Sequence, residues 1–336
     1  MRVLVAGGAG FIGSNFVRHA VQAHPDWQIV VADLLTYAGN LENLHDLLGG
    51  QRVRFVKADI ADRKAMEALL AAGFDYALNF AAATHVDRSI RDPEAFIRTD
   101  IYGAFTLLEA VRRHPVERFV QVSTDEVYGS LREGSAREDA PLMPTSPYSA
   151  SKAGADRLAF SYFATYGVPV VITRPSNTFG PYQHPEKLIP LFITNALEER
   201  PLPVYGDGQN VRDWLYVMDH CEALDFILRR GEPGVVYNIG GGSECTNLEV
   251  TAAILDYLGR PRSLIRHVRD RPAHDRRYSV DGSRLRSLGW QPRTEFRQAL
   301  HETIDWYVAR RSWWEKIKSG EFSDYYREQY GSEAGS

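Results

Sequence analysis

The glycine pattern between residues 7 and 13 is the feature that most restricts what this chain can fold into. An apolar, strand-like run, Val3–Ala6, ends directly before the segment Gly7–Gly13, which has the pattern G-x-x-G-x-x-G and is followed by a helical pattern from Ser14. Glycines at this spacing let the backbone approach a pyrophosphate, whose charge then lies at the N-terminus of the helix. Asp33 closes the next apolar run, where a carboxylate can accept from both hydroxyls of a ribose and would repel a 2′-phosphate. The segment therefore predicts a dinucleotide site that favours NAD over NADP.

The first half of the sequence alternates strand-like and helix-like segments. The strand-like runs are apolar throughout, which is typical of strands covered on both faces of a parallel sheet. Strands are expected at Val3–Ala6, Ile29–Ala32, Val53–Val56, Tyr76–Phe80, Phe119–Val122 and Val168–Ile172. Helices are expected at Ser14–Ala23, Arg63–Ala71, Ala104–Arg113 and Ser149–Tyr166. Because such alternation implies right-handed crossovers, the sequence predicts an α/β fold with a Rossmann-like, doubly wound parallel sheet.

The rhythm changes after Arg174, where proline and glycine become frequent and the strand-like runs become short and scattered. We therefore expect residues 1–174 to form the NAD-binding Rossmann domain and residues 175–314 to form mainly a smaller substrate-binding lobe. The run Val235–Ile239 is expected to return to the main sheet, which would interleave the two lobes. Residues 315–336 are expected to be a C-terminal extension with a flexible, Gly/Ser-rich end.

Composition excludes several other classes of protein. A net charge of −4 gives no general attraction to nucleic acid or to anionic lipid, and no apolar run reaches membrane-spanning length. Two cysteines are too few for a disulfide framework, and the histidines near the N-terminus lack the spacing of metal ligands, so no metal site is predicted. Because a strand-like run follows the first two residues directly, we expect no signal peptide and a cytoplasmic enzyme.

Tyr148 and Lys152 are four residues apart in a helix-like segment. On a helix this spacing places both side chains on one face, one turn apart. A nearby ammonium favours the phenolate and lowers the pKa of a tyrosine from its usual value of about 10. Such a tyrosine can take a proton from an alcohol while hydride leaves the same carbon. A helical tyrosine and lysine are more often surface residues, but beside a dinucleotide turn the pair indicates an active site.

The segment Thr124-Asp125-Glu126 comes shortly after the strand-like run Phe119–Val122. In an open parallel sheet, ligands bind beyond the carboxyl ends of the strands, so this segment is expected to face the nicotinamide. An Asp-Glu pair after a strand is usually a solvated cap, and only the neighbouring motifs favour a catalytic role here. Asp59 and Ile60, just past the third expected strand, are candidates for contact with the adenine.

Several further motifs resemble one known family. The chain is similar to the extended short-chain dehydrogenases/reductases, and within them to the dTDP-glucose 4,6-dehydratases, from residue 1 to about Trp314. The motifs that carry this resemblance are Leu35–Asn40, His85–Ser89, Ser123–Gly129, Gly180–Gln183, Pro185–Pro190, Tyr205–Gly208, Asn210–Asp213 and His274–Tyr278.

The resemblance implies a reaction and assigns its catalytic residues. Oxidation of C4 of a glucose unit makes the C5 proton acidic, water leaves across C5–C6, and hydride returned to C6 gives a 4-keto-6-deoxy sugar. The family implies Tyr148 with Lys152 as the base for the alcohol, Asp125 as the acid for the leaving hydroxyl, Glu126 as the base for C5, and Thr124 beside the C4 oxygen. Because the hydride is returned, NAD is expected to be tightly bound and recycled in each turnover.

The remaining candidates bind NAD or the nucleotide-sugar substrate. Arg212, Arg271 and His274 are candidates for the diphosphate, since a guanidinium fork matches phosphate oxygens, although isolated arginines are more often surface charges. For the substrate the resemblance adds Thr84, Asn177, Lys187, Leu188, Pro203, Tyr205 and Asn247. The full cofactor set is Gly7, Gly10, Phe11, Ile12, Gly13, Asp33, Asp59, Ile60, Ala81, Tyr148 and Lys152.

Four positions depart from the family pattern and bear on substrate fit. Ala83 stands where these enzymes commonly carry Glu, Asp100 replaces an Asn, Thr178-Phe179 follows Asn177 where Asn-Tyr is usual, and Ala273 replaces a Gly. Two other functions stay open at this point. One is a 4-epimerase or decarboxylase of UDP-sugars, which needs the Tyr–Lys pair but no Thr-Asp-Glu run, and the other is a non-catalytic NAD-binding scaffold.

The resemblance also implies a homodimer that pairs two long helices of each subunit, Ala104–Arg113 and Ser149–Tyr166. The aromatic residues Trp306, Tyr307, Trp313 and Trp314 are interpreted as a packing buttress near the end of the chain. Three tyrosines of the C-terminal extension are candidates for contact with a partner subunit: Tyr325, Tyr326 and Tyr330.

Overall fold

The computed structural model describes residues 1–319, 326 and 329–330. Within them, the largest sheet has seven parallel strands in the order β10-β6-β5-β4-β1-β2-β3. The strands are β1 (Arg2–Ala6), β2 (Gln28–Asp33), β3 (Val53–Lys57), β4 (Tyr76–Asn79), β5 (Arg118–Val122), β6 (Val170–Pro175) and β10 (Val236–Ile239). The sheet reverses its direction of growth between β1 and β4, so the fold is a doubly wound, Rossmann-like α/β fold as predicted.

Helices cover both faces of this sheet. On one face lie α1 (Phe11–Ala23) and α9 (Val217–Arg230), and on the other lie α3 (Arg63–Leu70), α6 (Gly103–Arg113) and α7 (Pro147–Tyr166). The alternation of side chains along β1 explains the two layers, because Val3 and Val5 join the core under α1 while Leu4 and Ala6 join the core under α3, α6 and α7. Burial on both faces is what the uninterrupted apolar runs of the sequence require.

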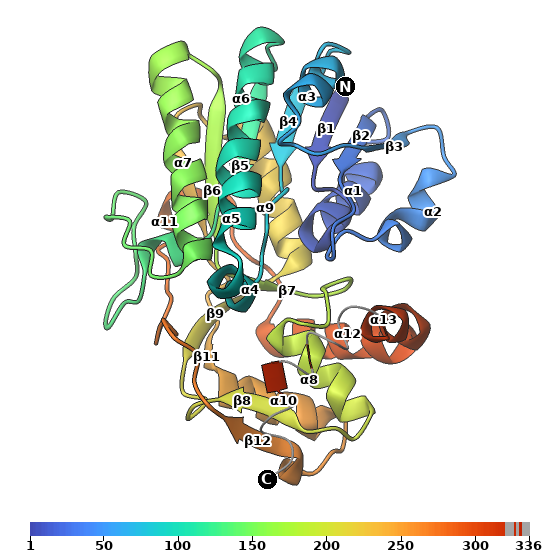
Figure 1. Ribbon diagram of the computed structural model, residues 1–336, viewed down its shortest axis with the longest axis vertical. Coiled ribbons are helices and arrows are strands. Elements are labelled where there is room, and N and C mark those ends of the chain that lie inside the picture. The colour runs from blue at the N-terminus through green and yellow to red at the C-terminus, as the bar shows by residue number, and fades with distance from the viewer. Residues whose placement is uncertain (320–325, 327–328, 331–336) are drawn as a thin grey trace.

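The second lobe is built from short strands and helices that lie below the sheet in Figure 1. One sheet has the order β11-β9-β7, and β8 pairs in parallel with β12. The strands are β7 (Asn177–Phe179), β8 (Leu202–Tyr205), β9 (Val211–Tyr216), β11 (Glu244–Thr246) and β12 (Ile265–Val268). The helices are α8 (Leu188–Leu197), α10 (Asn247–Tyr257), α12 (Phe296–Ala309) and α13 (Arg311–Lys318), whereas α11 (Ser283–Ser287) packs against β10 at the edge of the main sheet.

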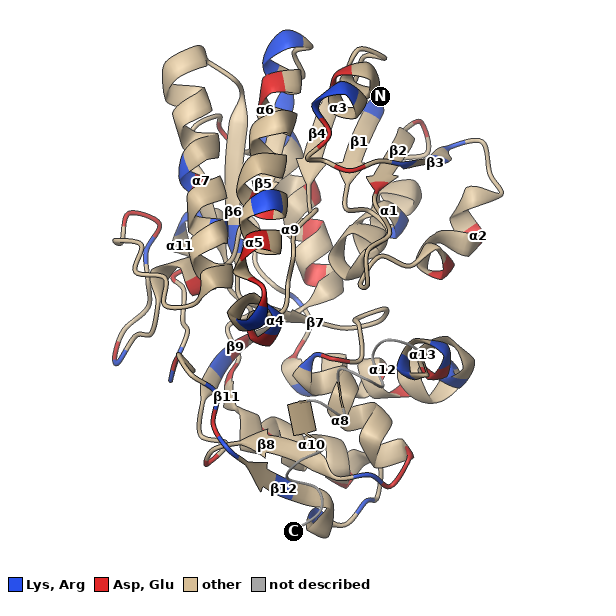
Figure 2. Cartoon of the chain, viewed as in Figure 1, with Lys and Arg blue, Asp and Glu red and all other residues tan. Residues whose placement is uncertain are grey.

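Short helical segments fill the loops at the carboxyl edge of the sheet. These are η1 (Leu41–Leu44), α2 (His45–Leu48), α4 (Val86–Arg91), α5 (Pro93–Phe96), the π-helical segment η2 (Ile97–Tyr102), η3 (Asp125–Tyr128) and, in the second lobe, η4 (Arg262–Leu264). Acidic and basic residues are interspersed over both lobes in Figure 2. No helix in the described part of the chain combines the length and the apolar character needed to cross a membrane.

The helix boundaries differ from the expected ones at two functional places. The first helix begins at Phe11 rather than Ser14, so the last part of the glycine segment already forms its first turn. Helix α7 begins at Pro147 rather than Ser149, because Ser146 caps the helix and proline fits the first helical position. The aromatic residues near the chain end pack as expected, with Trp313 buried and Trp314 fully buried.

Candidate active site

A large cavity lies at the carboxyl ends of the central strands and contains the whole predicted cofactor set. It encloses about 1610 Å³ of empty space, including its open mouth. The predicted residues that line it are Gly7, Gly10, Phe11, Ile12, Gly13, Asp33, Asp59, Ile60, Ala81, Tyr148 and Lys152. Ligands bind at this edge in doubly wound sheets, at the point where the strand order reverses.

The glycine turn tolerates no larger residues at two of its positions. Gly7 has φ +77°, and a Cβ on it would lie 2.4 Å from the Ala81 nitrogen at the end of β4. A Cβ on Gly13 would lie 2.4 Å from the Gly7 carbonyl oxygen. The backbone of β1 therefore turns tightly into α1, and Gly10, the residue before the helix, has no side chain to cap it. The residues of the first turn of α1 line the cavity, and their amides have no capping side chain, which fits a pyrophosphate.

Asp33 lies at the end of β2, beside the turn. Its carboxylate accepts from the amides of Ala9 (3.0 Å) and Leu35 (2.8 Å). Burial raises the pKa of Asp33, and these two amides lower it. A Cβ on Gly39 would lie 2.7 Å from Asp33 Oδ1, so the loop leaves little room around the carboxylate. The turn and the acid together fit the pyrophosphate and one ribose of NAD.

The segment Thr124–Glu126 follows β5 and forms a tight 3₁₀ turn. The Thr124 hydroxyl accepts from the Glu126 amide (3.3 Å) and lies 3.3 Å from Asp125 Oδ1. Asp125 is buried, and its second oxygen finds no hydrogen-bond partner among the described residues. Burial, together with the charges of Glu126 and Asp213, raises the pKa of Asp125 well above its usual range. The surroundings therefore favour the protonated form of Asp125.

Glu126 is next in sequence but has different neighbours. Burial raises its pKa, while the positive charges of Arg271, Arg212 and Lys187 lower it. The adjacent carboxyls therefore differ, because the cations that surround Glu126 favour its ionised form. Both pKa values are raised, but nearby carboxylates add to the rise at Asp125, whereas cations oppose it at Glu126.

Tyr148 and Lys152 lie in the first turns of α7, above the end of β5. Lys152 Nζ donates to the Val122 carbonyl oxygen at 2.7 Å. The expectation that Lys152 lowers the Tyr148 pKa is wrong: burial raises that pKa well above 10, and the charges of Glu126 and Asp100 add to the increase. The physical reason is that the ammonium is directed at a backbone carbonyl while carboxylates surround the phenol. Burial also lowers the pKa of Lys152.

A second cavity lies between the two lobes and holds most of the predicted substrate residues. Those that line it are Asn177, Lys187, Leu188, Pro203, Tyr205, Arg212, Asn247, Arg271 and His274. Thr84 is the exception, since it lines the cofactor cavity, where its carbonyl accepts from Lys187 Nζ (2.5 Å). The two cavities share Glu126, Asn177 and Lys187 in their walls. Of the catalytic candidates, Glu126 therefore lies where the cavities meet, and the others line the cofactor cavity: Thr124, Asp125, Tyr148 and Lys152.

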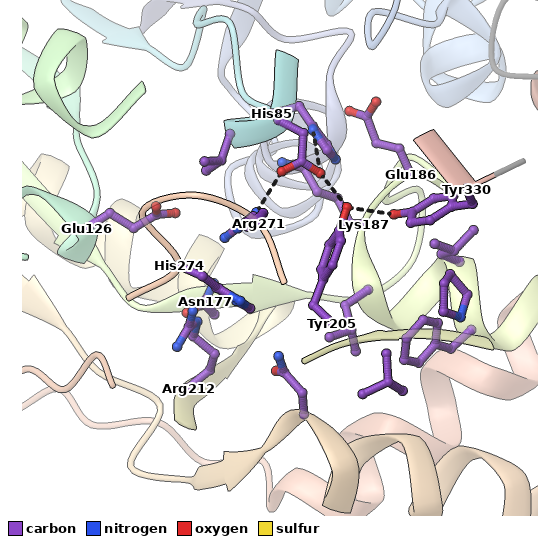
Figure 3. A pocket seen from close by; sticks show the side chains of 18 of the residues that line it. His85, Glu126, Asn177, Glu186, Lys187, Tyr205, Arg212, Arg271, His274 and Tyr330 are labelled. Atoms are coloured by element: carbon purple, nitrogen blue, oxygen red, sulfur yellow. Dashed lines mark hydrogen bonds and ion pairs between the residues drawn. The ribbon is translucent and has the colours of Figure 1, made fainter. Parts of the chain in front are cut away.

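Positive charge is concentrated on one side of this second cavity, as Figure 3 shows. Arg271 Nη1 pairs with Asp87 Oδ1 at 3.2 Å, and its buried Nε has no hydrogen-bond partner among the described residues. Arg212 lies over the Tyr278 ring at 4.4 Å and donates to the Asp275 carbonyl oxygen at 2.9 Å. Burial lowers the pKa of His274 to about 4. Two fixed guanidinium groups, one with a spare donor, suit a diphosphate.

Comparison with known proteins gives the family. A family model described as GDP-mannose 4,6 dehydratase matches residues 4–303. The dTDP-glucose 4,6-dehydratase of Streptomyces niveus is 49% identical over 324 residues, covering 95% of this chain and 96% of that protein. The chain belongs to the dTDP-glucose 4,6-dehydratases.

Solved structures of known enzymes agree with this family. The crystal structure of DesIV, a dTDP-glucose 4,6-dehydratase from Streptomyces venezuelae with NAD and TYD bound, is 50% identical with a TM-score of 0.93, covering 95% of this chain and 100% of that one. The UDP-glucose 4-epimerase of Thermus thermophilus with NAD is also similar, but at 32% identity and a TM-score of 0.86, covering 92% and 100%. The resemblance in sequence and fold is therefore greater to the dehydratase than to this epimerase.

Three of the departures from the dehydratase pattern make specific contacts. Asp100, in the π-helical segment η2, accepts from the Ala83 amide (2.8 Å) and from the Ser151 hydroxyl (2.6 Å). Burial raises the Asp100 pKa to about 6, opposed by the charge of Lys152. Thr178 Oγ1 lies 3.1 Å from Nδ1 of the buried His220. Ala273 has φ +51°, a conformation in which glycine is less strained.

Sequence reasoning missed several residues of this dehydratase site. His85, Asp87 and Glu186 line the substrate cavity, and their motifs were used for the resemblance without any role. The sequence did contain a signal for these residues, because charged residues in the same motifs are expected to form ion pairs with the candidate arginines. Tyr330 also lines this cavity and is only 8% exposed, so its assignment as a partner contact is corrected. Tyr325 and the end of the C-terminal extension lie outside the described residues.

Proposed function

We propose that this protein dehydrates dTDP-glucose to the 4-keto-6-deoxy sugar nucleotide. The observation that carries the proposal is the turn Thr124–Glu126, in which Asp125, a carboxyl whose surroundings favour its protonated form, is followed by the cation-flanked Glu126 at the junction of two cavities. A simple dehydrogenase or a 4-epimerase has no use for both groups. Elimination of water needs one group to give a proton and one to remove a proton from the neighbouring carbon.

The residues fit the individual proton transfers. NAD, when bound, would accept hydride from C4 and return it to C6, and its positively charged ring would lower the pKa of a neighbouring phenol. Tyr148 takes the proton of the C4 hydroxyl, and Thr124 donates to the C4 oxygen. Glu126 removes the C5 proton, and Asp125 gives its proton to the C6 hydroxyl as that group leaves as water. Each proton transfer is assigned to one of these side chains.

The second cavity supports binding of the nucleotide part of the substrate. Arg212 and Arg271 would hold the diphosphate, and Lys187 would hold the sugar end, since Lys187 also lines the cofactor cavity. Apolar side chains line the opposite wall, where a flat base can pack: Leu188, Leu191, Phe192 and Val204. A charged side for phosphates and an apolar side for a base suit a ligand in which a diphosphate joins a sugar to a nucleoside.

A homodimer is also proposed, through η2, α6 and α7. The support is a group of large apolar residues left exposed on these and adjacent elements: Ile90, Ile97, Tyr102 and Tyr166. Large apolar side chains left exposed on neighbouring helices are what a subunit interface would cover. A mass in solution twice that of the 37.9 kDa chain is expected in analytical ultracentrifugation. A cytoplasmic location stays a prediction from the sequence.

The decisive experiment follows the hydride. Incubation with dTDP-glucose deuterated at C4, with only trace NAD, is expected to give a 4-keto-6-deoxy product with deuterium at C6. An unlabelled C6, or no product, would contradict the proposal. A product epimerised at C4 would favour the epimerase, and binding of NAD without turnover of dTDP-glucose or UDP-glucose would favour the scaffold. The double variant Asp125→Asn, Glu126→Gln should abolish the dehydration.

A further inference from the structure

A buried arginine joins the two elements that carry the catalytic candidates. Arg174 lies near the end of β6, and its guanidinium forms a bidentate ion pair with Asp156 of α7, in which both side chains are buried. Arg174 Nε donates to Asp156 Oδ2 at 2.8 Å, and Nη2 donates to Oδ1 at 3.0 Å. The remaining nitrogen, Nη1, donates to the Tyr128 hydroxyl at 2.7 Å. Tyr128 is the last residue of η3, the turn that begins at Asp125.

Asp156 belongs to the helix that carries the tyrosine and the lysine. Tyr148, Lys152 and Asp156 follow one another at intervals of four, so their side chains lie on one side of α7. Burial lowers the pKa of Lys152, and the charges of Asp100 and Asp156 oppose this decrease. Helix α7 packs against η3 and against β6, beside which it runs in Figure 1. The ion pair with Arg174 therefore fixes α7 to the sheet one turn beyond Lys152.

The Tyr128 hydroxyl is engaged on both sides. It accepts from Arg174 and donates to Asn238 Oδ1 of β10 at 2.8 Å. The side-chain amide of Asn238 donates to the carbonyl oxygens of Ala136 (2.9 Å) and Asp281 (3.2 Å). Burial raises the pKa of Tyr128 to about 12, so the phenol keeps its proton near neutral pH. Because this single proton is given to Asn238, Tyr128 holds the turn in place and takes no part in proton transfer.

The four linked residues, which we call the Arg174 network, act at a distance from the ligands. Within the described part of the chain, the cofactor and substrate cavities are lined by none of them: Tyr128, Asp156, Arg174 and Asn238. A buried ion pair adds little to stability, since the desolvation of two charges opposes their attraction. Bidentate geometry does fix orientation. The network therefore sets the position of α7 relative to η3.

We propose that the Arg174 network is a positioning device for the reaction, which holds α7 and η3 against neighbouring carbons of one substrate so that elimination follows oxidation directly. The inference rests on the proposed function, in which both elements act on the same sugar in turn. Tyr148 of α7 takes the C4 hydroxyl proton as hydride leaves C4. In η3, Glu126 then removes the C5 proton, and Asp125 protonates the C6 hydroxyl as it leaves.

A shift between the two elements would separate these steps. The Tyr148–Lys152 pair would still support oxidation at C4, whereas Glu126 would no longer be placed against C5. Elimination would then become the slow step, and the 4-keto sugar would wait beside the reduced cofactor. The fraction of reduced cofactor during turnover therefore reports on the network, and a general loss of folded protein does not raise it.

The test compares Tyr128→Phe with the matched control Tyr237→Phe, using the full chain loaded with NAD. Tyr128→Phe removes only the hydroxyl that joins Arg174 to Asn238. For this variant we expect kcat for dTDP-glucose to fall by about tenfold, because small displacements of catalytic groups cause such losses, and the KM to stay within about twofold. The near-ultraviolet absorbance of reduced nicotinamide should rise above the wild-type level during turnover. Tyr237 is also a buried phenol, bonded to the Glu232 amide at 3.0 Å, and Tyr237→Phe should change neither kcat nor this absorbance.

Arg174→Lys tests the same network from its centre. A lysine ammonium lacks the planar fork that bonds Asp156 twice and reaches Tyr128 as well, so the same rise in reduced cofactor is expected. Since both changes act on one network, the double variant Tyr128→Phe, Arg174→Lys should lose no more activity than Arg174→Lys alone. Tyr128→Phe leaves the ion pair intact and decides the matter if Arg174→Lys does not fold.

The outcomes separate this inference from the proposed function. If the wild-type protein does not convert dTDP-glucose, the proposed function fails and the inference fails with it. If the wild-type protein converts it and Tyr128→Phe keeps the wild-type kcat and absorbance, only the inference is overturned. A fall in kcat and melting temperature with no rise in reduced cofactor would show a purely structural role. That result, or losses of activity that add in the double variant, would also overturn the inference.

Discussion

At the scale of single residues, the adjacent acids Asp125 and Glu126 have opposite electrostatic surroundings. Asp125 faces the carboxylates of Glu126 and Asp213, which oppose its ionised form, and the charge of Arg212 favours that form. Glu126 faces Arg271, Arg212 and Lys187. Because the two residues are adjacent in the sequence but face different neighbours, a single turn of the chain provides both a proton donor and a proton acceptor. Their roles can be separated by solvent exchange.

Asp125→Asn should lower kcat by at least about 100-fold, since an amide has no proton to give to the leaving hydroxyl. The C5 proton should still exchange with solvent, because Glu126 is intact. In D₂O, substrate recovered from this variant is expected to carry deuterium at C5, as shown by mass spectrometry. Glu126→Gln should lose this exchange. Wild-type kcat in Asp125→Asn, or unchanged exchange in Glu126→Gln, would exclude the assignment of roles.

Ala273 carries a backbone strain that glycine would remove. At φ +51° an alanine is disfavoured by about 1–2 kcal/mol. Glycine would remove this strain, but part of the gain in stability is offset by the larger conformational entropy that glycine loses on folding. Ala273→Gly is therefore expected to stabilise the protein by about 0.5–1 kcal/mol in urea denaturation. The opposite sign is expected for Ala68→Gly, in the middle of α3, at a cost of about 1 kcal/mol. Destabilisation by Ala273→Gly would show that the conformation is unstrained.

Some properties of single residues could be predicted from the sequence and others could not. The glycine segment and Asp33 were predictable because a turn, a helix start and a strand end are local features. The pKa of Tyr148 was not, because it depends on carboxylates far away in the sequence, such as Asp100. The place of Tyr330 was not predictable either, since its partners lie on β8 and no local pattern points to them.

At the scale of elements, the residue at which helix α7 begins determines the position of Tyr148. Ser146 accepts from the Ser149 amide (3.1 Å), and the Ser146 amide donates to the Ser149 hydroxyl (3.0 Å). This reciprocal cap begins the helix directly before Tyr148 and so places Tyr148 and Lys152 one turn apart. The helix was predicted from the sequence, but its start was placed at Ser149. The reciprocal hydrogen bonds that fix the true start become visible only in the structure.

Ser146→Ala is expected to destabilise the protein by about 1 kcal/mol, the usual cost of losing a capping side chain. Because Tyr148 lies in the first turn of the helix, kcat should fall while the KM changes little. Thermal unfolding and steady-state kinetics measure the two effects. Ser161→Ala is the control on the same helix, since the Ser161 side chain is exposed and only contacts the Leu158 carbonyl oxygen. Equal effects of both variants would argue against a role of the cap.

At the scale of the whole molecule, packing of the lobes buries histidines in the neutral form. Burial lowers the pKa of His220 to about 3 and that of His85 to about 4. An unfolded chain takes up protons on these groups below about pH 6.5, whereas the folded chain does not. Their contribution to stability is therefore complete above pH 6.5 and is lost progressively as the pH falls toward 4. The free energy of unfolding should therefore fall more steeply on acidification than the net charge of −4 alone would suggest.

For His220 alone, the expected loss between pH 7.5 and 5.5 is about 1.4 kcal/mol, since each pKa unit corresponds to about that energy. His220→Gln should remove this part of the pH dependence and keep a hydrogen bond with Thr178. Urea denaturation at the two pH values measures the difference. His45→Gln, at an exposed position, is the matched control. If the wild-type protein and His220→Gln lose equal stability on acidification, His220 does not contribute.

The position of β10 has a consequence for how the protein is made. This strand is the edge neighbour of β6, but sixty residues, which form β7, α8, β8, β9 and α9, lie between them in the chain. During synthesis, β6 emerges from the ribosome long before the strand that covers its edge. Its backbone groups therefore stay open until this first part of the second lobe and α9 have been made, and an uncovered strand edge is a template for aggregation. The second lobe cannot be exchanged as a separate cassette, because removing it also removes the strand that completes the first.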